Sequence, residues 1–318
     1  MIAVTGGNGF VGRALLAGLQ AAGQPAVGLV RDQRAAAAIA RHPITGNVRV
    51  AGDLAAAIDW QLLLRDVRVV VHTAARVHVM HAEGDDADAL YHQINTEASV
   101  RLARAAAAVG VQRLVYLSTV KVLGESTRPG TCFDAESAAN PGDPYARSKW
   151  AAEQALARVA DETGLDVVVV RPPLVYGPGV GGNFQRLMRL VRLGVPLPLA
   201  CVDNRRSLIG LGNLVDVLLH ACAHPSAAGE PLLVADAEPV STADLVRAMA
   251  EALQRPPRLW PMPPWLLRGL GRVSGRQAEL GRLLDDLVVD TRQTQALLDW
   301  APTRSMAAEL AAMVAAER

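Results

Sequence analysis

A tyrosine and a lysine four positions apart are the residues of this chain best suited to acid–base chemistry. Tyr145 and Lys149 lie in the segment YARSK, and this spacing puts both side chains on one face of a helix. An ammonium group beside a phenol stabilises the phenolate, which lowers a phenol pKa that starts at about 10. We therefore expect Tyr145 to act as a general acid or base on a carbonyl or an alcohol.

A glycine-rich turn near the start of the chain could hold a phosphate group. The sequence TGGNGFVG covers residues 5–12, between an apolar strand pattern and a helical pattern. Gly7 is expected to permit the tight turn, Gly9 to let a pyrophosphate approach, and Gly12 to let helix and strand pack closely. The amides at the helix start would then bind the phosphates of a dinucleotide. The expected contacts in this turn are Gly6, Gly9, Phe10, Val11 and Gly12.

The end of the second expected strand bears on the choice between NAD and NADP. An acidic side chain there would bind the ribose 2′-hydroxyl, whereas an arginine would accommodate a 2′-phosphate. Arg31 stands at this place, which favours NADP, while Asp32 keeps NAD open as the alternative. Asp53, after the third strand, could accept a hydrogen bond from the adenine amino group or form an Asx turn.

Apolar runs alternate with helical patterns through the first half of the chain, which indicates βαβ units and a doubly wound parallel sheet. After Pro172, proline and glycine become frequent and the pattern changes. We expect an α/β Rossmann-type fold with a smaller, interwoven lobe. The dinucleotide-binding domain would comprise residues 1–171 and about 207–235, and the substrate lobe about 172–206 and 236–318. The expected strands cover residues 2–5, 25–30, 48–51, 67–73, 114–118, 167–171 and 232–235.

The composition argues against several classes of protein. A formal net charge of +1 without a basic cluster argues against a nucleic-acid partner. Three widely spaced cysteines indicate reduced thiols in a cytoplasmic protein. His72, His78 and His81 have no acidic partner at ligand spacing, so we expect no metal site.

The segment PPWLL at residues 263–267 hints at a membrane surface. A packed helix start with proline in its first turn is the preferred interpretation. No apolar run approaches the roughly 20 residues of a membrane span, so we expect no stable membrane anchor.

The chain resembles the extended short-chain dehydrogenase/reductase family of nucleotide-sugar epimerases, dehydratases and 4-ketoreductases. Nearly the whole chain takes part in this resemblance. Segments 118–125, 172–179 and 204–208 are most similar to the subgroup that makes UDP-N-acetylquinovosamine or UDP-N-acetylfucosamine for surface polysaccharide. The matching motifs are the glycine turn, GDL at 52–54, HTAA at 72–75, Asn95, LST at 117–119, Tyr145 with Lys149, Arg171-Pro172, YGPG at 176–179 and Asn183.

The resemblance assigns roles to individual residues. Tyr145 would be the acid/base at the sugar C4 oxygen, assisted by Thr119 with Ser118 beside it, and Lys149 would lower the pKa of Tyr145 and bind the nicotinamide ribose. Leu123 departs from the tyrosine that many members carry there. Further cofactor contacts would be Asp53, Leu54, Thr73, Ala74, Ala75, Asn95 and Pro172. The substrate contacts would be Thr119, Lys121, Asn183, Arg206 and Arg282, the two arginines binding the diphosphate.

Two oxidoreductase reactions are compatible with these residues. The preferred one is the NADP-dependent reduction of a UDP-linked 4-keto-6-deoxy sugar, because Arg31 favours NADP. The alternative is an NAD-dependent UDP-hexose 4-epimerase. A dehydratase is disfavoured because Val120-Lys121 stands where dehydratases place an acidic pair, and an idle NADP sensor because the tyrosine and lysine are both present. The resemblance also implies a homodimer.

Overall fold

Seven parallel strands form the central sheet of the structure, a computed structural model that describes residues 1–40, 47–77, 85–275 and 277–317. The order across the sheet is β3-β2-β1-β4-β5-β6-β9. The strands are β1 (Ile2–Thr5), β2 (Ala26–Val30), β3 (Asn47–Val50), β4 (Val69–His72), β5 (Arg113–Leu117), β6 (Asp166–Arg171) and β9 (Pro231–Leu233). The valine runs of β4 and β6 suit these central positions, because parallel strands are buried on both faces.

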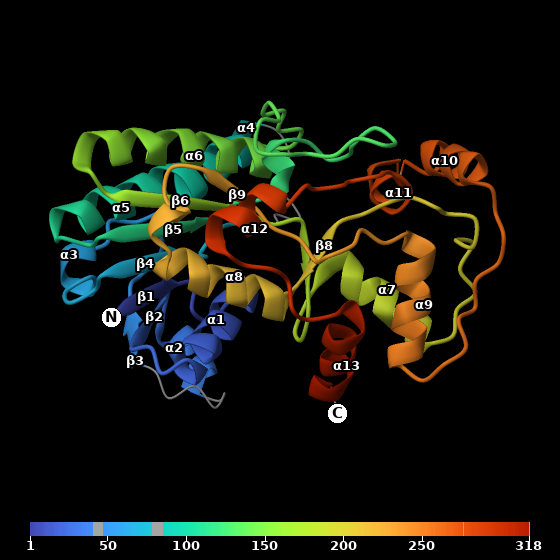
Figure 1. Ribbon diagram of the computed structural model, residues 1–318, viewed down its shortest axis with the longest axis horizontal. Helices are drawn as coiled ribbons and strands as arrows, with labels where there is room; N and C mark the ends of the chain where they lie inside the picture. The colour runs from blue at the N-terminus through green and yellow to red at the C-terminus, as the bar shows by residue number, and fades with distance from the viewer. Residues whose placement is uncertain (41–46, 78–84, 276, 318) are drawn as a thin grey trace.

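Helices cover both faces of the sheet, as Figure 1 shows. Helices α1 (Phe10–Ala21), α2 (Gln33–Ala40) and α8 (Leu211–Ala223) pack on one face, and α3 (Trp60–Leu63), α5 (Ala98–Ala108) and α6 (Pro144–Thr163) on the other. Each layer has its own apolar core against the sheet. The predicted doubly wound α/β fold is therefore confirmed.

The helical segment over residues 85–108 contains a wider turn in its middle. A short helix, α4 (Asp85–Tyr91), leads into the π-helical turn η1 (His92–Glu97), and α5 follows. The Ser99 hydroxyl donates to the Asn95 carbonyl at 2.7 Å. The wider turn accompanies inward-facing Asn95 and Thr96 side chains, which are both buried and both bond to α6. The wider turn thus lies where Asn95 and Thr96 hydrogen-bond to α6, the helix that carries Tyr145 and Lys149.

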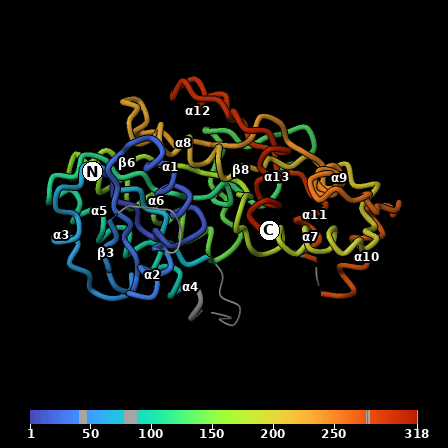
Figure 2. The backbone as a smooth tube through the Cα atoms, turned by 90° about the horizontal axis from the view of Figure 1, so that it is seen from below, coloured from blue at the N-terminus to red at the C-terminus, as the bar shows by residue number. Residues whose placement is uncertain are grey.

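A smaller lobe lies beyond the carboxyl edge of the sheet (Figure 2). Its two-stranded sheet pairs β7 (Leu174–Tyr176) with β8 (Leu208–Gly210). Leu298 and Trp300, which the sequence assigns to this lobe, pack instead into the dinucleotide-domain core with α1 and α8. The remaining elements are α7 (Gly182–Arg192), α9 (Thr242–Ala252), α10 (Pro264–Val273), α11 (Gln277–Leu284), α12 (Arg292–Leu298), α13 (Met306–Ala316) and the 3-10 turns η2 (Val120–Val122) and η3 (Pro225–Ala227).

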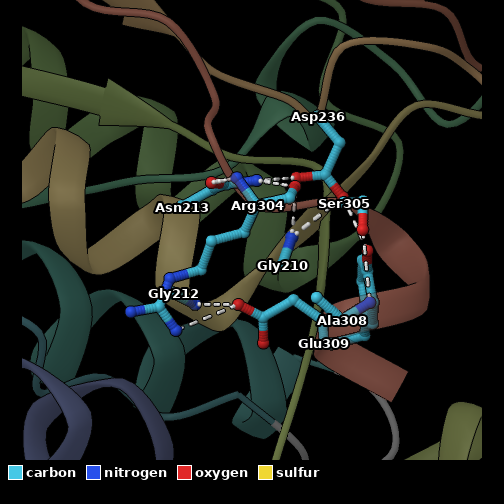
Figure 3. Close-up of polar contacts among 9 residues, drawn as sticks. Gly210, Gly212, Asn213, Asp236, Arg304, Ser305, Ala308 and Glu309 are labelled. Carbon is cyan, nitrogen blue, oxygen red and sulfur yellow. Dashed lines mark hydrogen bonds and ion pairs between the residues drawn. The ribbon is translucent and has the colours of Figure 1, made fainter. Parts of the chain in front are cut away.

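Two carboxylates fasten the lobe to the first turn of α8 (Figure 3). Asp236 accepts hydrogen bonds from the Gly210 amide at 3.0 Å and from Asn213 Nδ2 at 2.7 Å. Glu309, from α13, accepts one from the Gly212 amide at 3.0 Å. A Cβ atom at Gly212 would lie 2.3 Å from Glu309 Oε1, so the close approach requires glycine. The backbone amides at the start of α8 therefore already bind carboxylates of the protein itself.

Candidate active site

The glycine turn joins β1 to α1 in the geometry expected of a dinucleotide site, with one correction. The left-handed conformation falls on Gly6, with φ of +65°, and not on Gly7, which we expected to permit the turn. A Cβ at Gly6 would lie 2.9 Å from Ala74 Cα, and one at Gly12 would lie 2.2 Å from the Gly6 carbonyl oxygen. Gly7 packs instead against Gly28 of β2, where a Cβ would lie 3.1 Å from the Gly28 Cα.

The first turn of α1 is suited to an anionic ligand. Its N-cap, Gly9, offers no side-chain hydrogen bond, and the first turn contains no acidic residue. The start of α8 differs, since Asp236 and Glu309 bind its amides (Figure 3). Amides at Phe10 and Val11 thus face the position where a pyrophosphate would bind, favoured also by the helix dipole. These residues fit a dinucleotide cofactor.

The residues after β2 and β3 bear on whether the site can hold the 2′-phosphate of NADP. Arg31 follows β2 directly, and its side chain is 70% exposed. The Asp32 carboxylate caps α2 by accepting the Ala35 amide at 2.8 Å, and Arg31 Nε donates to it at 3.3 Å. Asp53 accepts the Ala55 amide at 2.9 Å in an Asx turn. Asp32 is therefore engaged both by its own helix and by Arg31, whose side chain is largely exposed.

The segment after β4 is held rigidly beside the glycine turn. The Thr73 hydroxyl donates to the Thr5 carbonyl at 2.6 Å, and the Ala74 amide donates to the Thr5 hydroxyl at 3.2 Å. Asn95 Oδ1 accepts the Arg76 amide at 2.8 Å, and Asn95 Nδ2 donates to the Arg76 carbonyl at 3.1 Å. Both the oxygen and the nitrogen of the Asn95 amide thus position this segment, which includes Ala75. The direct cofactor contact expected of Asn95 stays a prediction.

His72 is a buried structural residue. Its ring nitrogens hydrogen-bond to the Thr5 hydroxyl at 2.7 Å and the Ser99 hydroxyl at 3.0 Å. Burial, and to a smaller extent the charge of Lys149, lowers the pKa of His72 to about 3, so the ring stays neutral. His78 and His81 lie outside the described residues, and the described ones contain no group of three potential metal ligands.

Tyr145 and Lys149 lie on α6 as predicted, and a hydrogen-bonded chain fixes the first turn of this helix. Asn95 Nδ2 donates to the Ser148 hydroxyl at 2.9 Å, which donates to the Tyr145 carbonyl at 2.8 Å. Lys149 Nζ lies 4.0 Å from the centre of the Tyr116 ring. Burial lowers the pKa of Lys149 to about 7, against the opposing charge of Glu153. Lys149 can therefore exchange a proton near neutral pH.

The pKa of Tyr145 is raised, contrary to the expectation that Lys149 lowers it. Burial is the largest cause, and electrostatic interactions with Asp143 and with Tyr91 add to it. The Tyr91 ring meets the Tyr145 ring edge-on, with centroids 6.3 Å apart. The Lys149 ammonium faces the Tyr116 ring. An oxidised nicotinamide would bring a positive charge that favours the Tyr145 phenolate.

Ser118 and Thr119 have different roles, although both were expected to be catalytic. The Ser118 hydroxyl donates to Glu153, a buried carboxylate that also pairs with Arg171 at 2.5 Å. Thr119 Oγ1 accepts the Lys121 amide at 3.3 Å and keeps its own hydrogen to donate. Thr119 thus remains the candidate for orienting a substrate, and Ser118 is corrected to a structural residue. The Pro172 carbonyl supports this turn by accepting the Val120 amide at 2.9 Å.

Lys121, expected to bind substrate, is engaged by two carboxylates of the protein. Its ammonium lies 2.7 Å from Glu125 and forms a shorter contact with Asp143. Asp143 also caps α6 by accepting the Ala146 amide at 2.6 Å. Burial raises the pKa of Asp143, but the hydrogen bond from Lys121 and that from the Ala146 amide lower it overall. Lys121 therefore compensates the negative charge that stands two residues before Tyr145.

Lys121→Met and Asp143→Asn should move the acidic limb of the kcat/KM pH profile in opposite directions. Without Lys121, the Asp143 charge acts unopposed, the Tyr145 phenolate is disfavoured, and the limb moves to higher pH by about one unit or less. Asparagine keeps the helix cap but removes the charge, so the limb moves to lower pH. Lys121→Arg is the matched control and should leave the profile in place. Shifts of equal sign in the Met and Asn variants would refute this electrostatic role.

Asn183, Arg206 and Arg282, three of the residues expected to hold the nucleotide-sugar, lie in the facing lobe. Asn183 lies exposed in the first turn of α7. Arg206 Nη1 donates to the Asp285 carbonyl at 2.8 Å. Burial lowers the pKa of Arg206 most, the charge of Asp285 opposes this, and the charge of Arg282 lowers the pKa further. The charges of Asp286 and Glu125 also oppose the lowering of the Arg206 pKa.

The roles of three site residues were not predicted from the sequence. The Glu153–Arg171 pair and the cap Asp143 carry no motif that marks their roles. Glu153 stands four positions after Lys149 on α6, and this spacing could have indicated a carboxylate near the lysine. Arg76 has a buried Nε without a hydrogen-bond partner, a feature visible only once the fold is known.

Known proteins of similar sequence match most of this chain. The chain is 39% identical over 309 residues to UDP-glucose 4-epimerase of Vibrio cholerae, covering 96% of this chain and 92% of that one. It is 30% identical over 267 residues to 2-alkyl-3-oxoalkanoate reductase of Stenotrophomonas maltophilia, covering 80% and 76% of the two chains.

A solved structure and a family model agree with these matches. The structure of UDP-glucuronic acid 4-epimerase from Bacillus cereus in complex with NAD superposes with a TM-score of 0.78 at 19% identity, covering 98% of this chain and 96% of that one, which shows the shared fold. The model of the NAD dependent epimerase/dehydratase family matches residues 2–235. The chain is therefore an enzyme of the NAD dependent epimerase/dehydratase family.

Proposed function

We propose that this enzyme oxidises or reduces C4 of a UDP-linked sugar, with Tyr145 as the acid/base. The observation that carries the proposal is the placement of Tyr145 and Lys149 on α6 beside Asn95, which in turn holds the segment next to the glycine turn. A bound nicotinamide would accept or deliver the hydride. Thr119 orients the C4 oxygen, and Arg206 and Arg282 bind the diphosphate from the facing lobe.

The leading reaction is 4-epimerisation of a UDP-hexose. This reverses the order preferred from the sequence, because the relative from Vibrio cholerae is named UDP-glucose 4-epimerase and is 39% identical over 96% of this chain. In an epimerase, Tyr145 takes the proton of the C4 hydroxyl and returns it after the hydride has come back on the opposite face. The cofactor ends the cycle unchanged.

NADPH-dependent reduction of a 4-keto-6-deoxy sugar, in surface polysaccharide synthesis, is the second candidate. The exposed Arg31 at the end of β2 favours it, because this position adjoins the adenosine ribose in Rossmann folds. Asp32 is engaged in capping α2. A reductase is also among the similar proteins. In this reaction Tyr145 donates its proton to the C4 oxygen once.

An assay with two substrates separates the candidates. Conversion of UDP-glucose to UDP-galactose by the purified protein without added cofactor would establish the epimerase. Consumption of NADPH only in the presence of UDP-N-acetyl-4-keto-6-deoxyhexosamine would establish the reductase. Failure of both reactions, with the cofactor demonstrably bound, would refute a C4 reaction on these UDP-sugars.

Arg31→Asp should exchange the cofactor preference. The aspartate would repel a 2′-phosphate and bind the ribose hydroxyls, so we expect NADP(H) affinity to fall by about tenfold or more and NAD(H) affinity to rise. Fluorescence titration with both reduced cofactors measures the change. Arg34→Asp, at a nearby exposed arginine, is the control for general charge. An unchanged ratio of affinities would remove Arg31 from the cofactor site.

We also propose a homodimer formed through α5 and α6. An open groove of about 640 Å³ lies between these helices, with Val100, Trp150 and Ala151 among its lining residues. Helices of a second copy would fill it with apolar contacts. Light scattering of the purified protein measures the mass. The cytoplasmic location predicted from the sequence stays a prediction.

A further inference from the structure

Helix α10, at the far end of the lobe, turns an apolar face to solvent. Trp265 is 72% exposed, Leu270 52% and Val273 90%, and Leu266 is 38% exposed. The packed helix start preferred from the sequence is correct for the proline at its first turn and for Leu267, which is buried, but wrong for Trp265 and Leu266. Figures 1 and 2 both show α10 at the outer edge of the molecule, away from the sheet.

The apolar face lies within the most basic segment of the chain. Residues 255–282 contain six arginines and a single acidic residue, Glu279, in a chain whose net charge is +1. Arg272, on α10 itself, is exposed, and Arg268 is half exposed while paired with Asp285 at 2.5 Å. Trp260, before the helix, is 43% exposed. Exposed tryptophans and leucines beside arginines are the composition of helices that lie in the interface of anionic membranes.

A second copy of the chain fits this face less well than a bilayer does. In a two-fold symmetric contact the same surface meets itself, so the arginines around α10 would face one another and repel. The α5–α6 groove suits a second copy better, because residues of both charges line it: Glu97 and Glu162 together with Arg101 and Arg104. An anionic surface complements both the apolar side chains and the arginines.

We propose that α10, with the arginines beside it, docks this enzyme reversibly on an anionic lipid bilayer. The helix would lie parallel to the surface, with Trp265, Leu266, Leu270 and Val273 among the lipid headgroups and acyl chains. No helix in the described part of the chain could cross a membrane. The docking does not depend on which sugar reaction the enzyme performs.

Vesicle sedimentation tests the proposal with the full-length protein. The protein should pellet with vesicles containing about 30% phosphatidylglycerol at low salt, and at least about tenfold less with pure phosphatidylcholine or in about 0.5 M salt. Trp265→Ser combined with Leu270→Ser and Val273→Ser should lower the partition coefficient at least about tenfold. The matched control, Val50→Ser with Leu62→Ser, removes exposed apolar side chains from the dinucleotide domain and should bind as wild type.

Two results would overturn the proposal. One is an equal partition of the wild type and the triple variant on anionic vesicles. The other is a concentration-dependent mass in light scattering that the triple variant abolishes without any vesicle binding of the wild type, which would assign the face to a second copy. Circular dichroism checks that the variants fold, which we expect because the substituted side chains are exposed.

Discussion

Replacing Tyr145 by phenylalanine should lower kcat by about 10³, because general acid–base catalysis by a positioned side chain contributes roughly 10²–10⁴. The substitution removes one hydroxyl and keeps the ring, which packs edge-on against Tyr91. No hydrogen bond of the Tyr145 hydroxyl to another described residue contributes to the fold. We therefore expect an unchanged melting temperature and unchanged dinucleotide affinity. Turnover with either candidate substrate is the measurement.

Thr119→Val is the matched comparison for Tyr145→Phe. It removes the second hydroxyl that could contact the C4 oxygen, while the side chain keeps its shape. Since Thr119 would orient the oxygen without carrying the proton, its loss should cost less, about 10- to 100-fold in kcat/KM. Ser118→Ala should instead lower stability, because its hydroxyl donates to Glu153. Full turnover in Tyr145→Phe would refute the assignment of the acid/base.

The fold could be predicted from the sequence because its signals are local. Valine runs in β4 and β6, and the glycines between β1 and α1, each depend on neighbouring residues. The position of the left-handed glycine was missed by one residue, since Gly6 and Gly7 are identical in type and only the contact with Ala74 distinguishes them. The four-residue spacing of Tyr145 and Lys149 predicted that they share a helix, and α6 confirms this.

The roles of charged and hydroxyl side chains depended on partners far apart in sequence. Ser118 and Thr119 are adjacent, yet only the folded chain shows that one faces the Glu153–Arg171 pair. Lys121 resembles a ligand-binding lysine until Glu125 and Asp143 come within reach. The prediction that the apolar side chains at the start of α10 are packed was wrong for Trp265 and Leu266. An apolar pattern predicts a buried face but does not say which other segment covers it.

Breaking the Glu153–Arg171 pair should be the most destabilising single change that we propose. Arg171 Nη2 donates to Glu153 at 2.5 Å and Arg171 Nε donates at 3.2 Å, and the two side chains are 7% and 4% exposed. Arg171→Met leaves the carboxylate buried without its cation, which costs about 3–5 kcal/mol. Denaturant unfolding of the wild type and the variant measures this difference. A loss below about 1 kcal/mol would show that water reaches the pair.

The double variant Glu153→Leu with Arg171→Met tests what the pair is for. Because desolvation offsets most of the attraction between buried charges, apolar replacement of both partners should restore most of the stability. Activity should not return with it. Burial lowers the pKa of Lys149 and the Glu153 charge partly opposes this, with a net pKa of about 7, so without Glu153 the lysine holds its proton only at lower pH. We expect the double variant to be nearly as stable as wild type, and its activity at neutral pH to be low but partly recovered on acidification. Full activity at neutral pH would show that the pair serves the fold alone.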